Sequence, residues 1–179
     1  MACKEQGKYY TQAFKSQLIE AGWDVRENNQ DEQDKTPDLY LFFNNKIFVP
    51  FEIKSLTTPF RSSERLVKIP PEKCITLQTV EFENCYNYDP TGLMGFHVDF
   101  TPEFPTSGQY WSTVREINLF YQEAKQCGRV REIYRAGSKK RRLFYFSLDH
   151  LKPLSELLEL SRKFHEVSDE LLTLLGLVA

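Results

Sequence analysis

Apolar and polar residues follow one another in patterns that predict a series of short helices and strands. Over residues 8–21, apolar side chains recur every three or four positions and a glycine follows, which predicts an amphipathic helix. Alternation or short apolar runs predict strands at 23–26, 39–43, 47–54, 66–69, 94–100 and 143–148. Further helices are predicted from Pro71 through 77–82 and over 114–126, with a loop at 101–111.

The strands at 39–43 and 47–54 are predicted to pair as an antiparallel hairpin. Asn44 and Asn45 lie between them, and asparagine is a typical turn residue. Because side chains alternate along a strand, Glu52 and Lys54 share one face of the second strand. Pro50 cannot donate to a strand ladder, so it predicts an edge position or a bulge beside Glu52.

The C-terminal segment has its own pattern of apolar positions. Its apolar residues are spaced by three and four, as in a heptad repeat: Leu157, Leu160, Phe164, Val167, Leu171 and Leu174. The repeat is too short for a coiled coil that stands alone. Either this helix packs on its own domain, or it joins copies into a homodimer or higher homo-oligomer. We therefore expect one domain over 1–150 and a helical extension over 151–179.

Composition narrows the class of protein. The chain has 179 residues, of which 41% are hydrophobic, 14% aromatic and 27% charged, which is typical of a globular domain. No apolar run is long enough to span a membrane, and the N-terminus lacks the apolar stretch of a signal peptide. The four cysteines form no close pair. We expect reduced thiols, a cytoplasmic location and no membrane partner.

Positive charge is concentrated in one segment although the net charge of the chain is only −2. Residues 125–142 hold eight basic residues and one acidic residue, Glu132. Such asymmetry is typical of a surface that meets phosphate groups, and the alternative is a solvated hairpin without a ligand. The residues expected to contact phosphates are Arg129, Arg131, Arg135, Lys139, Lys140, Arg141 and Arg142.

The predicted hairpin carries the residues that point to chemistry. Asp38 stands at the start of the first strand, and the antiparallel pairing can bring it close to Glu52. Two carboxylates that converge require a positive partner, and Mg²⁺ prefers such oxygen ligands. The backbone carbonyl of Ile53 is a third candidate ligand, and Lys54 can orient a water for attack. This set suits phosphodiester hydrolysis, whereas the alternative is a surface ion pair between Glu52 and Lys54.

Pro37-Asp38 and Glu52-Ile53-Lys54 resemble the motif of the PD-(D/E)xK nuclease superfamily. The order of predicted elements over residues 5 to about 100 is similar to the αβββαβ core of restriction endonucleases and archaeal Holliday-junction resolvases. The segments QGKYYTQAFKSQLIEAGWDV and LVKIPPEKCITL contribute to the likeness. The resemblance implies an α/β fold with a mixed central sheet flanked by helices. It also implies that Asp38 and Glu52 bind Mg²⁺, with Mn²⁺ as a substitute, that Lys54 is catalytic, and that DNA is the substrate.

The chain departs from the family pattern on the first helix. Many members carry a glutamate there that completes the metal site, whereas this chain has Thr11 and Gln12 at the comparable turn. Gln12 or the earlier Glu5 is therefore a candidate substitute. The number of metal ions, one or two, stays open.

These features predict a metal-dependent endonuclease that acts on double-stranded DNA. A restriction enzyme, a homing endonuclease and a junction resolvase all fit, and the long segment beyond the core favours a sequence-specific enzyme. Tyr110 and Trp111 either stack on a base or close the core. One alternative is an inactive nucleic-acid-binding module with the same fold, and another is an assembly protein that acts through its C-terminal helix.

Overall fold

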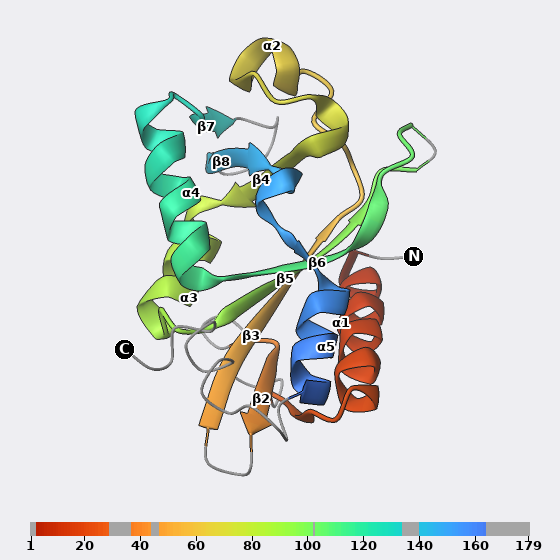
Figure 1. Ribbon diagram of the computed structural model, residues 1–179. Coiled ribbons are helices and arrows are strands. Elements are labelled where there is room, and N and C mark those ends of the chain that lie inside the picture. Colours follow the sequence, from red (N-terminus) through yellow and green to blue (C-terminus); the bar gives the residue numbers. More distant parts are fainter. Residues whose placement is uncertain (1–2, 29–36, 44–46, 102, 134–139, 164–179) are drawn as a thin grey trace.

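The computed structural model describes residues 3–28, 37–43, 47–101, 103–133 and 140–163. A six-stranded mixed sheet lies at the centre, with helices on both faces, and a three-stranded sheet lies beside it (Figure 1). The central sheet has the order β1 (Asp24–Glu27), β2 (Leu39–Phe43), β3 (Ile47–Leu56), β5 (Leu93–Asp99), β6 (Ser107–Thr113) and β9 (Lys152–Pro153). The second sheet has the order β4 (Cys74–Gln78), β8 (Arg141–Ser147) and β7 (Val130–Ile133).

The helices are α1 (Cys3–Glu20), α2 (Ser63–Val67), α3 (Thr79–Tyr88), α4 (Val114–Gln126) and α5 (Leu154–Lys163), with 3₁₀ turns at Pro71–Lys73 and Leu148–His150. The order α1, β1, β2, β3, α3, β5 is the expected αβββαβ core, with α2 and β4 inserted before α3. The predicted mixed sheet flanked by helices is thus confirmed. None of the helices in the described ranges is long and apolar enough to cross a membrane.

Each face of the central sheet has its own apolar core. Helices α1 and α5 lie together on one face, and α3 and α4 lie on the other (Figure 1). On the α1 face, Phe14 packs with Phe51 of β3. A Cβ atom on Gly95 of β5 would lie 2.7 Å from Phe51 and 2.9 Å from Phe14, so a larger residue here would force the two rings to shift. On the other face, alternate residues of β5, among them Phe96, join the core formed with α3, α4 and β8.

The hairpin β2–β3 forms as predicted, but Pro50 does not lie at an edge. Strand β3 lies between β2 and β5, and its register with β2 continues without a bulge from Leu39↔Phe51 through Tyr40↔Pro50. The expectation of an edge or bulge was therefore wrong. Strand β5 starts opposite Phe51, so the ladder on that side begins just after Pro50 and the missing N–H leaves no gap.

Two predicted elements between β3 and β5 were also wrong. Helix α2 takes up the first two residues of the strand expected at 66–69, and Ser63 and Val67 are buried one helical turn apart. Pro71 opens only a 3₁₀ turn, and residues 74–78 are the strand β4, which pairs with β8 far along the chain. The helix predicted to start at Pro71 is therefore α3, which begins later, at Thr79.

The predicted loop at 101–111 contains the start of a strand. Strand β6 pairs with β5 in an antiparallel ladder that places Trp111 opposite Gly95. Trp111 is fully buried in the core, so it closes the core and is not free to stack on a base. Strand β7, within the basic segment, was not predicted as a strand because its short run alternates only weakly.

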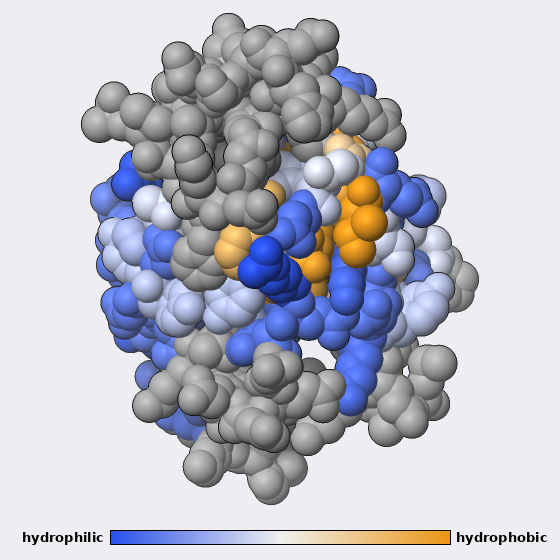
Figure 2. Space-filling view, turned by 90° about the horizontal axis from the view of Figure 1, so that it is seen from below, coloured by the Kyte–Doolittle hydropathy of each residue, from blue (hydrophilic) through white to orange (hydrophobic). Residues whose placement is uncertain are grey.

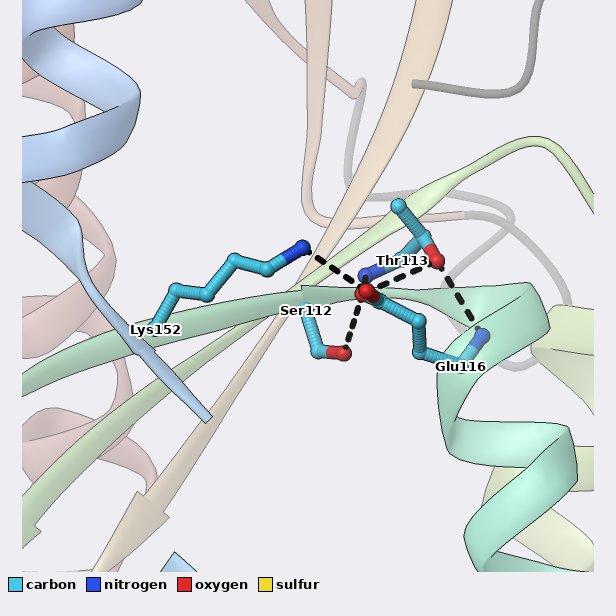
Figure 3. Close-up of polar contacts among 4 residues, drawn as sticks. All are labelled: Ser112, Thr113, Glu116 and Lys152. Carbon is cyan, nitrogen blue, oxygen red and sulfur yellow. Dashed lines mark hydrogen bonds and ion pairs between the residues drawn. The ribbon is translucent and has the colours of Figure 1, made fainter. Parts of the chain in front are cut away.

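The junction between β6 and α4 is held by a network around Glu116 (Figure 3). Thr113 is the N-cap of α4: its hydroxyl accepts from the backbone N–H of Glu116, and its own N–H donates to the Glu116 carboxylate. Ser112 and Lys152 also donate to this carboxylate, at 2.9 and 2.7 Å. The network ties α4, β6 and β9 together at this edge of the sheet.

Loss of this cap is expected to destabilise the protein measurably. Thr113→Ala removes the acceptor for the Glu116 N–H at a buried position and should lower the free energy of unfolding by about 0.5–2 kcal/mol. Urea unfolding followed by circular dichroism measures the change. Ser62→Ala is the matched control, because the side chain of Ser62 makes no capping bond to α2. An equal loss in both variants would contradict this role of the Thr113 hydroxyl.

The described part of the C-terminal helix packs on its own domain. Leu154 and Leu157 of α5 are buried in the core on the α1 face, and Leu160 packs against that core. The remaining positions of the heptad pattern, from Phe164 onward, lie outside the described residues. Self-association through this helix therefore stays a prediction. On the face of the molecule seen from below, the described residues are mostly hydrophilic, and apolar surface appears only in small patches (Figure 2).

Candidate active site

The register of the hairpin brings Asp38 beside Glu52. The β2–β3 ladder is assigned as far as Leu39↔Phe51, and continuing it by one residue places Asp38 opposite Glu52. Asp38 does not continue the ladder with its backbone. Instead its carboxylate Oδ2 accepts a hydrogen bond of 2.8 Å from the backbone N–H of Ile53. The Asp38 carboxylate is thereby held at the strand end, next to the carboxylate of Glu52.

Pro37 has no N–H that could bond the Ile53 carbonyl. The assigned β2–β3 ladder ends at Leu39↔Phe51, so Ile53 lies beyond it. The N–H and C=O of a strand residue point to the same neighbouring strand. The Ile53 carbonyl therefore faces the side on which Asp38 takes the Ile53 N–H. The Ile53 carbonyl oxygen thus points to the side of β3 on which the Asp38 carboxylate lies.

Lys54 lies between carboxylates from two elements. Its Nζ is 2.7 Å from Oε1 of Glu52 and 3.5 Å from Oε2 of Glu81. The side chains of Lys54 and Glu52 are each 19% exposed, so this is not the surface ion pair considered from the sequence. Glu81 belongs to α3, and Cys85 lies one turn later on the same helix, close enough to these groups for their charges to act on its thiol. Helix α3 therefore covers the strand face that carries Glu52 and Lys54.

Burial and charge shift the pKa values of these groups. Burial, and then the charge of Glu52, raise the pKa of Asp38 from 3.8 to about 6, although the Ile53 N–H and Lys54 oppose the shift. Burial alone would lower the pKa of Lys54, but the carboxylates of Glu52 and Glu81 outweigh it and raise this pKa further above its usual range. Lys54 is thus an ammonium ion at neutral pH. Burial raises the pKa of Cys85 to about 12, so its thiol stays protonated.

The donor set suits a hard divalent cation. Two carboxylates, Asp38 and Glu52, lie near each other beside Ile53, and their mutual repulsion contributes to the raised pKa of Asp38. Among the described residues, no group of three or more His, Cys, Asp or Glu side chains is arranged to hold a metal ion. Mg²⁺ commonly binds through only one or two carboxylates and keeps several waters. Asp38, Glu52 and the Ile53 carbonyl are therefore the groups that could hold such an ion.

The raised pKa of Asp38 predicts opposite pH effects on stability and on cation binding. The folded protein holds the Asp38 proton more tightly than the unfolded chain, so this contribution to stability is present below pH 4 and is lost as pH rises through about 6. Cation affinity should rise over the same range, because the ligand must be deprotonated. Urea unfolding and Mn²⁺ titration from pH 4 to 8 measure both. If the difference in unfolding free energy between wild type and Asp38→Asn does not change with pH, the raised pKa of Asp38 is contradicted.

The first helix does not bring Gln12 to this site. The amide of Gln12 donates to Oε1 of Glu27 at 2.9 Å, and Lys15 bonds the same carboxylate. Glu27 pairs in register with Leu39, which packs in the core on the α1 face. Side chains alternate between faces, so Gln12 and Glu27 lie on the opposite face of the sheet from Glu52, and ligation by Gln12 stays a prediction. The side chain of Glu5 lies outside what the structure describes.

Sequence reasoning missed Glu81 and Cys85. Both lie on α3, four residues apart and thus on one helix face. That spacing was visible in the sequence, but no local pattern indicates which strand face a helix will cover. The contact with Lys54 depends on the path of the chain through α2 and β4, which was predicted incorrectly.

The basic segment is only partly available for ligands. Arg129 pairs with Glu123, Arg131 donates to the carbonyl of Leu66, and Lys140 pairs with Glu132. Arg141 and Arg142 are exposed at the start of β8. The remaining two candidates, Arg135 and Lys139, lie outside the described residues.

Two solved structures are similar to this chain in overall fold. One is D212, a nuclease from a fusselovirus, with 16% identity and a TM-score of 0.49 over 93% of this chain and 96% of that chain. The other is Hjc of Archaeoglobus fulgidus, a Holliday junction resolvase, with 10% identity and a TM-score of 0.47 over 86% of this chain and 98% of that chain. No protein-family model and no curated protein matches the sequence. Likeness at this level concerns the shape of the chain and assigns no activity.

Proposed function

We propose that the protein is a metal-dependent endonuclease that hydrolyses phosphodiester bonds in double-stranded DNA. The convergence of Asp38 and Glu52, with the Lys54 ammonium 2.7 Å from Glu52, is the observation that carries this proposal. A half-buried acidic pair with its own cation has little value for stability, because desolvation offsets the attraction between the charges. Its chemistry suits binding of a divalent ion and of a phosphate.

Each residue has a distinct role in this proposal. Asp38, Glu52 and the Ile53 carbonyl hold Mg²⁺ or Mn²⁺, and the Ile53 N–H fixes the Asp38 carboxylate in orientation. The bound ion supplies Lewis acidity that neutralises charge on the scissile phosphate. Lys54 donates hydrogen bonds from a permanent ammonium, so it stabilises negative charge on the phosphate and orients the attacking water without accepting its proton.

We further propose that basic side chains at the start of β8 contact the DNA backbone. Arg141 and Arg142 are exposed, and Arg favours bidentate contact with phosphate. Replacing 139–142 with alanine should weaken DNA binding and flatten its dependence on salt. Sequence-specific cleavage and junction resolution are both compatible with this site. A homodimer would supply two sites for the two strands of a duplex.

One observation favours an inactive nucleic-acid-binding module as the second candidate. Gln12 contacts Glu27, so the first helix adds no known ligand among the described side chains, and only two carboxylates, Asp38 and Glu52, are proposed as ligands. If two carboxylates are too few for turnover, the protein binds DNA and does not cut it.

Incubation of supercoiled plasmid and branched DNA with the protein tests the proposal. Nicking or linearisation in Mg²⁺ or Mn²⁺, and none in EDTA, is the expected result. Asp149→Asn is a suitable control for preparation artefacts, because this exposed carboxylate pairs with Lys73. Binding without cleavage under all metal conditions would overturn the enzyme in favour of the binding module.

A further inference from the structure

Glu81 is placed to hold Lys54 independently of Glu52. Its two carboxylate oxygens have different partners: Oε1 accepts from the Gln78 amide at 2.6 Å, and Oε2 lies 3.5 Å from Lys54 Nζ. Gln78 is the residue just before α3, and Glu81 lies in the first turn of that helix. The Gln78 bond therefore aims the second oxygen of Glu81 at the ammonium.

Glu52 would be shared between two cations. In the structure its Oε1 bonds Lys54 at 2.7 Å, and the function proposed above requires the same carboxylate for a divalent ion. Such an ion would draw the negative charge of Glu52 away from Lys54 and weaken the nearest contact of the ammonium. A largely buried ammonium without a partner is costly, and it would turn toward solvent or toward another carboxylate. Glu81 is the other carboxylate within 4 Å of Lys54 Nζ among the described residues.

We propose that Glu81 is a positioning residue, which keeps the Lys54 ammonium at the scissile phosphate while Glu52 is engaged with the divalent ion. The inference rests on the nuclease function proposed above. It gives α3 a role in the reaction: the helix supplies a counter-charge, held by Gln78, to a lysine that belongs to the neighbouring sheet. Glu81 acts through Lys54 and does not itself touch the substrate.

Glu81→Gln tests this role, with Glu83→Gln as the matched control on the same helix. Glu81→Gln should lower kcat about tenfold to a hundredfold, the value of a hydrogen bond to a charged group, and leave KM for DNA nearly unchanged. In a Lys54→Met background it should have no further effect, since the residue through which it acts is gone. Glu83 is exposed and accepts from Tyr121, so its replacement should leave kcat unchanged.

Mn²⁺ binding without DNA provides a readout that is independent of turnover. Calorimetric titration should give the same Mn²⁺ affinity for wild type and Glu81→Gln, because Glu81 is not a ligand. A loss of Mn²⁺ affinity in Glu81→Gln, an unchanged kcat, or an effect that persists in Lys54→Met would each overturn the proposal. Gln78→Met removes the donor to Glu81 and should also lower kcat. This variant replaces Glu81→Gln as the test if Glu81→Gln fails to fold.

The outcomes separate this inference from the proposed function. Wild type that cleaves DNA only with a divalent ion, together with a fully active Glu81→Gln, would refute the role of Glu81 alone. Wild type that cleaves no substrate under any metal condition would refute the nuclease function, and the positioning role would fall with it.

Discussion

Asp38→Asn is expected to abolish metal-dependent DNA cleavage and to leave the fold and DNA binding intact. Asparagine keeps an oxygen that can accept the Ile53 N–H, so the strand end retains its hydrogen bond. It removes one of the two negative charges that we propose hold the divalent ion. Loss of that charge should lower kcat by at least about 10³-fold, since metal-assisted charge stabilisation amounts to several kcal/mol.

The same substitution is expected to stabilise the protein at neutral pH. The pKa of Asp38 is raised to about 6 by burial and by Glu52, so its ionised form opposes folding above that pH. A variant that is more stable and inactive cannot owe its inactivity to unfolding. Asp24→Asn is the control, because Asp24 lies on β1 and pairs with Arg26 at the surface. More than about a tenth of wild-type cleavage in Asp38→Asn would exclude Asp38 from the catalytic site.

Lys54→Met is expected to lower kcat by about 10²–10⁴-fold, the range found when a group that assists proton transfer or charge stabilisation is removed. Methionine keeps an unbranched side chain in the space that the lysine stem occupies. It leaves Glu52 and Glu81 without the ammonium that lies between them. We therefore also expect a lower free energy of unfolding at pH 7 than in wild type, because a buried pair broken at one partner leaves uncompensated charge.

Lys54→Arg separates charge from proton transfer. The pKa of Lys54 is raised above its usual range, so the lysine acts as a cation, and arginine is also a cation at all relevant pH values. The arginine variant should retain more activity than the methionine variant, although its planar group will fit less well. Single-turnover cleavage measures both, with Lys73→Met as the control for loss of an exposed lysine that pairs with Asp149. Wild-type rates in Lys54→Met would contradict a catalytic role.

The local pattern of the sequence was enough to predict the hairpin and the faces of its residues. Alternation with a period of two places Glu52 and Lys54 on the same face, and Asn44-Asn45 marks the turn. Once the strands pair around that turn, the register brings Asp38 opposite Glu52. Each of these steps depends on residues within about twenty positions of one another, which is why a single sequence revealed them.

Contacts between distant segments were not visible in the same way. Strand β4 pairs with β8, about seventy residues later, and β5 adds to β3 in parallel. Such pairings depend on how the whole chain packs, so residues 66–78 were predicted incorrectly, and so was the position of Pro50. Each helix lies on the face of the sheet that buries its apolar side. This packing between layers places Gln12 beside Glu27, on the face away from Glu52, and places Glu81 beside Lys54.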